Sequence, residues 1–208
     1  MEGTAAYFDI PLERHTVDTA EGEHIACFRI PNPGKPVVIM QHGLMSNSRQ
    51  FIYLGKESIA YRVWSQGFDI WLTNTRENGY SRPYDGTYKW DYTWEELALV
   101  DMPQVIDFIL KSTSKEQLIY IGHSQGGRII YSLLSERPEY NEKVQLFAAM
   151  APGMYIYNEN FHPLKTTPAA VFETLTDGRV QLPPKMLCYA CVISETFCWL
   201  LMGATFVP

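Results

Sequence analysis

The sequence predicts an α/β fold built on a mainly parallel sheet, and two observations carry this prediction. Apolar runs without polar–apolar alternation recur along the chain, as expected of strands that are buried on both faces. Segments with helical periodicity separate these runs, so helices are expected to cover the sheet. With 208 residues, a hydrophobic fraction of 46% and a charged fraction of 19%, the chain has the composition of a globular domain.

The expected elements alternate through the chain. A hairpin of two short strands, 15–19 and 23–30, comes first. The further expected strands span 37–40, 68–72, 118–121 and 144–150, and the expected helices span 56–66, 94–100, 101–110 and 125–136. Thr93 and Glu96 predict a capping box at the start of one helix. Pro103 suits a first helical turn but not a helix interior, so a second helix start is expected at Asp101.

The stretch that organises the chain is Gly122-His123-Ser124-Gln125-Gly126, between an apolar strand and an apolar helix. It matches G-x-S-x-G, in which small residues flank a serine exposed on a strained strand-to-helix turn. The strand and helix on either side favour Ser124 as a nucleophile over a plain glycine-serine turn, with the Gln125 N–H as an oxyanion donor. His123 is expected to pack beside the turn rather than act as a base. Elbow and parallel sheet together predict an α/β-hydrolase fold.

Further segments carry a resemblance to a known family. They are 15–22 (HTVDTAEG), 36–44 (PVVIMQHGL), 67–76 (GFDIWLTNTR), 90–110 (WDYTWEELALVDMPQVIDFIL), 122–126 (GHSQG) and 146–152 (LFAAMAP). In this order they resemble the acid lipases, the family of lysosomal acid lipase and gastric lipase. Thr73 and Glu77 depart from the family pattern, which has glycines at these positions.

The resemblance implies a lipase that hydrolyses neutral lipids, triacylglycerols or cholesteryl esters, through an acyl-enzyme at Ser124. It also implies that the backbone N–H groups of Leu44 and Gln125 form the oxyanion hole, and that residues 74–76 are structural. The expected partner is therefore a lipid ester substrate, and no cofactor is expected. Family members are lysosomal or secreted, but the start of this sequence shows no signal peptide, so no compartment is assigned.

The acid and the base of a catalytic triad are not found in the sequence. Hydrolases of this fold place their triad in the order serine, acid, histidine, and the family takes the last two from strands beyond its cap. His162 is the only histidine after Ser124, and it is expected to be a cap-loop residue. The chain is thus expected to be truncated, with residues 1–157 as the N-terminal part of the core and 158–208 as an incomplete cap. A catalytically inactive chain that binds lipid or a partner is the alternative function.

Charge and cysteine content exclude other classes of partner. The formal net charge is −6, and the basic residues are not clustered, so a nucleic-acid partner is not expected. Cys188 and Cys191 lack a second pair of ligands, which predicts buried thiols or a local disulfide and no metal site. The apolar stretch 186–207 contains Glu195 and is expected to be a cap segment rather than a membrane span. Such a segment would still favour association with membranes, lipid surfaces or other copies.

Overall fold

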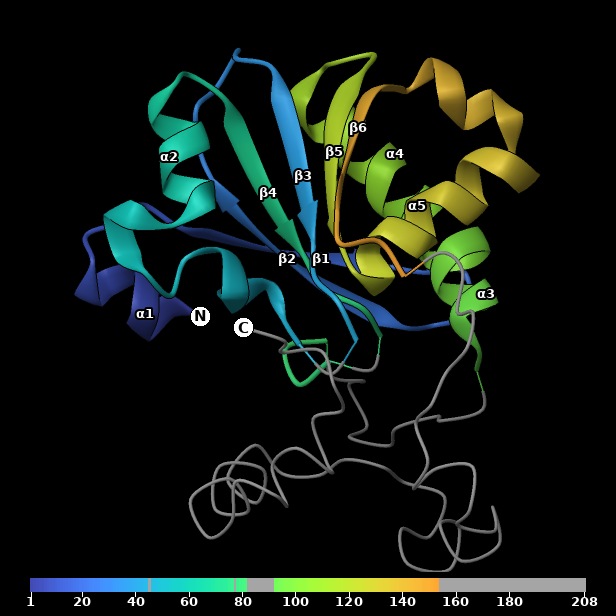
Figure 1. Cartoon of the computed structure of the whole chain (residues 1–208), viewed down its shortest axis with the longest axis horizontal. Helices are drawn as coiled ribbons and strands as arrows, with labels where there is room; N and C mark the ends of the chain where they lie inside the picture. The colour runs from blue at the N-terminus through green and yellow to red at the C-terminus, as the bar shows by residue number, and fades with distance from the viewer. Residues whose placement is uncertain (45, 77, 82–91, 154–208) are drawn as a thin grey trace, which may run out of the picture. The chain divides into compact units, whose positions relative to one another are not determined.

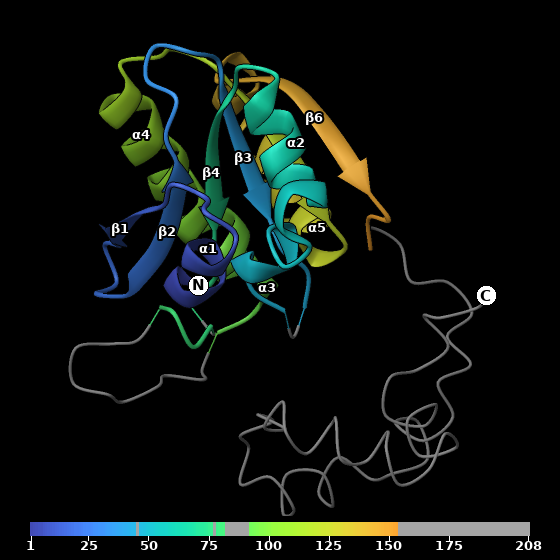
Figure 2. The ribbon, with the colours of Figure 1, turned by 90° about the vertical axis from the view of Figure 1, so that its left-hand side faces the viewer.

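The computed structural model describes residues 1–44, 46–76, 78–81 and 92–153, and a six-stranded sheet forms its centre. The strands are β1 (Glu13–Asp18), β2 (His24–Ile30), β3 (Val37–Gln41), β4 (Asp69–Thr73), β5 (Leu118–His123) and β6 (Val144–Met150). Their order across the sheet is β1-β2-β4-β3-β5-β6. Figure 2 shows β1 and β2 toward one edge and β6 at the other. The last four are mutually parallel, and β1 and β2 form the antiparallel hairpin at one edge. The predicted α/β fold with a mainly parallel sheet is confirmed.

Helices cover both faces of the sheet (Figure 1). One face packs against α1 (Glu2–Tyr7), the 3₁₀ turns η1 (Ser48–Phe51) and η2 (Gly55–Glu57), and α2 (Ile59–Ser65). The other packs against α3 (Trp94–Glu96), the π-helical turn η3 (Leu97–Asp101), α4 (Met102–Thr113) and α5 (Gln125–Glu136), while the 3₁₀ turn η4 (Pro138–Glu142) precedes β6. Because side chains alternate along a strand, each central strand contributes side chains to the hydrophobic cores on both faces of the sheet.

Strand β3 shows this division most clearly. Its five residues are all buried. Val37 and Ile39 belong to the core beneath α4 and α5, whereas Val38 and Met40 belong to the core beneath α2. A strand buried on both faces has no polar side to alternate with, which explains why β3 was recognisable as an unbroken apolar run.

The helix predicted at 56–66 begins later than expected. The 3₁₀ turn η2 comes first, and α2 starts only at Ile59. Gly55 has a φ of +59°, and a Cβ there would lie 2.4 Å from the Phe8 ring. The Ser58 hydroxyl donates to the Gly55 carbonyl and closes this turn, so the chain reaches Ser58 in an extended conformation before the helix can form.

The predicted second segment begins where expected, since α4 starts at Met102 with Pro103 in its first turn, but the predicted capping role of Asp101 is wrong. The capping box is present: Thr93 Oγ1 accepts a hydrogen bond from the Glu95 N–H, and Glu96 accepts one from the Thr93 N–H. The helix then passes through the π turn η3 into α4 with Asp101 in helical conformation. Asp101 caps nothing, because its carboxylate accepts two hydrogen bonds from Arg76, from Nε at 2.8 Å and Nη2 at 2.6 Å.

The Arg76–Asp101 pair is expected to be important for stability. Both side chains are 6% exposed, and Arg76 also bonds to Glu21 at 2.8 Å. Removing one member of a buried pair leaves the other charge uncompensated, so Asp101→Ala should lower the free energy of unfolding by about 3 kcal/mol. Denaturant unfolding measures this change. Glu57→Ala, which removes the partner of Arg62 in an exposed pair, is the control and should cost less than about 1 kcal/mol. Equal losses in the two variants would contradict the prediction.

The predicted cap at 158–208 lies outside the described residues, as do His162 and the apolar stretch 186–207. The division of the chain at residue 157 therefore stays a prediction. Within the described part, none of the helices has both the length and the apolar character needed to cross a bilayer.

Candidate active site

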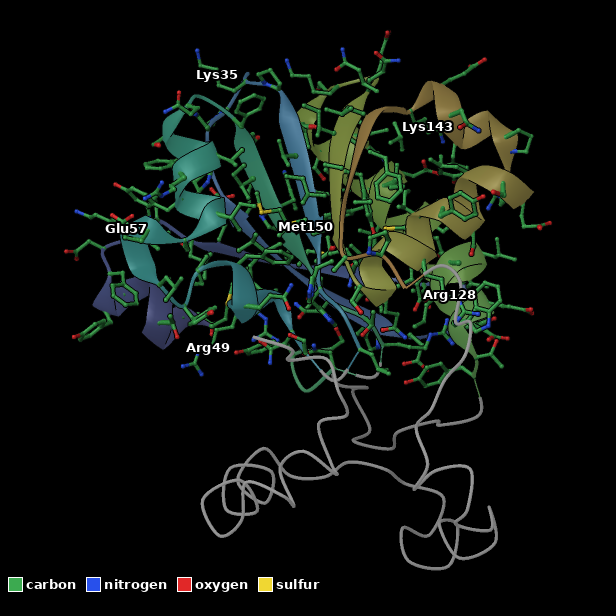
Figure 3. The ribbon with its side chains drawn as sticks, viewed as in Figure 1. Lys35, Arg49, Glu57, Arg128, Lys143 and Met150 are labelled. Atoms are coloured by element: carbon green, nitrogen blue, oxygen red, sulfur yellow. The ribbon has the colours of Figure 1, made fainter. Side chains whose placement is uncertain are left out.

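Buried polar residues gather at the carboxyl ends of the parallel strands. In Figure 3 the labelled Lys35, two residues before β3, lies at the top of the view, and the labelled Arg49, in η1, lies toward the bottom, where the parallel strands end. The polar residues buried at or after the ends of β3 and β4 are Gln41, His42, Ser48, Thr73, Asn74, Thr75, Arg76, Asn78 and Ser81. In open α/β sheets this is the edge where ligands bind.

Ser124 occupies the turn between β5 and α5, where the sequence predicted it. Its φ of 52° and ψ of −115° lie in a region that residues with a side chain seldom adopt. Four backbone hydrogen bonds hold it there. Its N–H donates to the Met150 carbonyl at 2.9 Å, and its carbonyl accepts from the N–H groups of Gly127, Arg128 and Gly153. The conformation is therefore imposed by the ends of β5, α5 and β6 together.

The two glycines of the motif are needed because backbone approaches them closely. A Cβ at Gly122 would lie 2.7 Å from the backbone of Gly126 and Gly127. A Cβ at Gly126 would lie 2.4 Å from the carbonyl oxygen of Gln41 and 2.8 Å from that of His42. The helix after Ser124 is thus pressed against the end of β3, and only glycine permits this packing.

The loop after β3 lies directly beside the elbow. A Cβ at Gly43 would be 3.0 Å from the Ser124 Cβ and 3.2 Å from His123 Nδ1. Among the described residues, neither the Leu44 N–H nor the Gln125 N–H donates to another group. The contact brings the two predicted oxyanion donors into the neighbourhood of Ser124; their role stays a prediction.

His42 is fully buried, and both of its ring nitrogens are engaged. Nδ1 lies 2.7 Å from the Gly43 carbonyl oxygen and Nε2 lies 3.2 Å from Asn78 Nδ2. Burial lowers the pKa of His42 to about 4, although the bond to Gly43 opposes this shift and nearby His123 adds to it. His42 is therefore neutral near pH 7 and has no free nitrogen for a substrate.

The other described histidines are no better placed to act as a base. His123 Nδ1 is buried against Gly43 and, among the described residues, has no hydrogen-bond partner. His15 and His24 belong to the hairpin at the sheet edge, where His15 stacks on Trp71 with ring centroids 4.7 Å apart. None of these contacts identifies His15, His24 or His123 as the general base for Ser124.

The low pKa of His42 predicts that acid destabilises the fold. Between about pH 6.5 and pH 4 an unfolded His42 binds a proton that the folded protein excludes, so stability falls as the pH falls through this range. The maximum contribution is about 3 kcal/mol, at roughly 1.4 kcal/mol per pKa unit. Urea unfolding at pH 7 and pH 4.5 measures it. His42→Asn should show a smaller loss between the two pH values, and an identical loss would contradict the assignment.

The stretch 74–76 has structural contacts. The Asn74 side-chain amide donates to the Ala26 carbonyl at 2.9 Å, and its oxygen accepts from the Ser48 N–H at 3.0 Å. Asn74 thereby ties β2 to η1, as Arg76 ties the hairpin to η3. Thr73, one of the two departures from the family pattern, is buried and its hydroxyl donates to Gln41 Oε1 at 2.6 Å, so it fits the strand end. Glu77, the other departure, lies outside the described residues.

The described residues contain no group of three His, Cys, Asp or Glu side chains able to hold a metal ion. Cys27 is buried in β2, and burial raises its thiol pKa to about 12, so this cysteine stays protonated. Cys188 and Cys191 lie outside the part of the chain that the structure describes.

Comparison with known families decides the assignment of the chain. A family model described as the alpha/beta hydrolase fold matches residues 36–187, which include β3, the elbow and β6. The chain belongs to the α/β-hydrolase family. A second family model, described as a partial alpha/beta-hydrolase lipase region, matches residues 1–55.

Sequence relatives place this α/β-hydrolase with the acid lipases. It is 35% identical to Lipase 1 of Drosophila melanogaster over 85% of this chain and 42% of the relative. It is 33% identical to gastric triacylglycerol lipase of Bos taurus, over 88% of this chain and 50% of the relative. Its identity to human lysosomal acid lipase/cholesteryl ester hydrolase is 34%, over 71% and 40% of the two chains. The chain thus spans about half or less of the length of these relatives, and the resemblance to acid lipases is confirmed for their N-terminal portion.

Solved structures agree on the fold. The thioesterase domain from the curacin biosynthetic pathway has a TM-score of 0.59 at 17% identity, covering 95% of this chain and 69% of that domain. The epoxide hydrolase VrEH1 of Vigna radiata has a TM-score of 0.55 at 17% identity, covering 97% of this chain and 60% of the enzyme. At these identities the likeness shows the α/β-hydrolase fold alone.

Proposed function

We propose that the protein is a lipase, an ester hydrolase of neutral lipids that works through an acyl-enzyme at Ser124. The observation that carries this proposal is the strained elbow conformation of Ser124 beside the Gly43-Leu44 peptide. The sequence similarity of this chain to gastric triacylglycerol lipase and to lysosomal acid lipase/cholesteryl ester hydrolase supports triacylglycerols or cholesteryl esters as the substrate class.

In the proposed reaction Ser124 Oγ attacks the ester carbonyl carbon and a new C–O bond forms. The carbonyl oxygen gains negative charge, which the N–H groups of Leu44 and Gln125 stabilise, together with the positive end of the α5 dipole. The proton of the serine hydroxyl passes to a general base. When the tetrahedral intermediate collapses, the bond between the carbonyl carbon and the alcohol oxygen breaks, and the base gives this proton to the departing alcohol. Water then attacks the carbonyl carbon of the acyl-enzyme, the bond to Ser124 Oγ breaks, and the fatty acid is released. No described residue is assigned as the base.

Trapping of the acyl-enzyme tests the proposal. The chain is incubated with nitrophenyl butyrate, quenched in acid, digested and analysed by mass spectrometry. We expect a butyryl group on the peptide that contains Ser124, and no adduct on this peptide in Ser124→Ala. Ser135→Ala removes an exposed serine from the same helix and should acylate normally. Acylation elsewhere, or an unmodified Ser124 peptide in the natural chain, would contradict an acyl-enzyme at this serine. Retained binding of a labelled triacylglycerol without acylation would instead support the catalytically inactive lipid-binding alternative.

A further inference from the structure

A closed ring of hydrogen bonds surrounds the peptide that follows Gly43. His42 Nδ1 and the Ser46 N–H both contact the Gly43 carbonyl oxygen, at 2.7 Å and 3.3 Å. The side-chain amide of Asn78 contacts His42 Nε2 at 3.2 Å and the Ser46 carbonyl oxygen at 3.0 Å. Asn78 belongs to the segment that follows β4, and its one side chain contacts both ends of the turn, at His42 and at Ser46.

The contacts of Asn78 fix the protonation of His42. Asn78 Oδ1 accepts a hydrogen bond from the Tyr80 N–H at 2.9 Å, which orients the amide with its NH₂ group toward His42 and Ser46. His42 Nε2 faces this donor, so it must be the acceptor nitrogen. The proton of the neutral ring is then on Nδ1, where it is donated to the Gly43 carbonyl. The contact at Nδ1 and the contact at Nε2 therefore require the same tautomer of His42.

The direction of the Gly43 carbonyl determines the direction of the next N–H. In a trans peptide the C=O and N–H bonds point to opposite sides, and all peptide bonds among the described residues are trans. With the Gly43 oxygen held by His42 and Ser46, the Leu44 N–H points away from the His42 ring. Gly43 itself lies against the Ser124 Cβ.

We propose that His42 and Asn78 are positioning residues, which hold the Gly43-Leu44 peptide so that the Leu44 N–H faces an oxyanion formed at Ser124. This inference rests on the proposed function, because only an acyl-transfer reaction at Ser124 forms that oxyanion. A hydrogen bond to the Gly43 carbonyl also polarises the peptide, which makes the Leu44 N–H a stronger donor.

Protonation of His42 would break this arrangement. A proton on Nε2 would face the Asn78 NH₂ group, and two donors cannot share a hydrogen bond. The titratable group that adds to the low pKa of His42 is His123, whose Nδ1 lies beside Gly43 on the elbow side. The ring is uncharged well into the acidic range, so the peptide stays in place there.

Nuclear magnetic resonance directly tests which nitrogen of the His42 imidazole carries the proton. In the full chain carrying Ser124→Ala and ¹⁵N-labelled histidine, we expect His42 to show a protonated Nδ1 and a bare Nε2 from pH 7 down to about pH 5, with titration below that range. In Asn78→Asp a carboxylate replaces the donor, so a proton on Nε2 becomes favourable and the His42 pKa should rise. An Nε2-protonated ring in the natural sequence would overturn the proposal.

Steady-state kinetics on nitrophenyl butyrate test the functional consequence. Displacing one oxyanion donor typically lowers kcat by roughly a hundredfold, so Asn78→Ala and His42→Leu should lose kcat by roughly ten- to a hundredfold with KM within about twofold. In His42→Asn the amide nitrogen takes the place of Nδ1, and it should recover roughly tenfold over His42→Leu. Asn141→Ala is the matched control, because Asn141 also donates to two backbone carbonyls, those of Leu134 and Pro138 in the α5–η4 region.

The outcomes separate the two proposals. If turnover depends on Ser124 but the His42 and Asn78 variants match Asn141→Ala, the positioning role is wrong and the proposed function stands. If KM rises while kcat is unchanged, the pair acts on substrate binding and the positioning role is again wrong. If the natural chain shows no turnover or acylation that depends on Ser124, the proposed function fails and the positioning role falls with it.

Discussion

Ser124→Gly is expected to unfold at a higher denaturant concentration than the natural chain while losing its ester hydrolysis. A non-glycine residue with a φ of 52° and a ψ of −115° carries backbone strain of about 1–3 kcal/mol. Glycine relieves this strain, although it also raises the entropy of the unfolded chain by an amount worth about 0.5–1 kcal/mol. The net gain should be about 1 kcal/mol. Where the general base is present, the loss of the nucleophile should lower kcat/KM by roughly a thousandfold or more.

Ser124→Ala is the control that separates the two effects. Alanine removes the same hydroxyl but keeps a Cβ, so its activity should fall as far as that of Ser124→Gly without the gain in stability. Urea unfolding and nitrophenyl butyrate hydrolysis are measured on both variants and the natural chain. If both variants are equally stable, the elbow stores no strain. If both retain activity, Ser124 is not the nucleophile.

The sequence predicted those parts of the fold that depend on short stretches of chain. Strands β3 and β5 were recognisable because each contains four consecutive apolar residues, 37–40 and 118–121, as expected of strands covered on both faces. The elbow was recognisable for a related reason. Gly122 and Gly126 are required by contacts that the turn itself creates, so the requirement appears as a short spacing around Ser124.

Contacts between distant loops could not be predicted in this way. His42 and Asn78 are 36 residues apart, and Arg76 and Asp101 are 25 residues apart. No local pattern indicates that an asparagine in one loop will orient a histidine in another. The failed capping prediction at Asp101 has the same cause. An aspartate shortly before a proline is typical of a helix start, but here the carboxylate accepts hydrogen bonds from Arg76, which is distant in the sequence. A polar residue directly after an apolar strand, such as His42 after β3, is the one local signal that pointed to this cluster.

Gly126→Ala is expected to prevent the native fold from forming. The added Cβ would lie 2.4 Å from the Gln41 carbonyl oxygen and 2.8 Å from that of His42. Both obstacles are backbone atoms at the end of β3, the strand at the centre of the sheet, so no side-chain rotation can relieve the overlap. Moving α5 outward would break the Tyr120 hydroxyl bond to the Gly126 carbonyl and open the core that Ile129, Ile130 and Leu133 fill. The expected cost is about 5 kcal/mol, which equals the whole stability of many domains.

Circular dichroism and urea unfolding measure this effect, with Gly3→Ala as the matched control. Gly3 lies in α1, and a Cβ there would meet nothing within 4 Å, so alanine should stabilise the chain by about 0.5–1 kcal/mol through its greater helix propensity. A Gly126→Ala chain that folds with near-native stability would show that α5 can withdraw from β3. Ser124 would then keep its place in the sequence but lose the close contact with the Gly43 loop on which the proposed active site depends, and acylation of Ser124 in that variant should fall even though the fold survives.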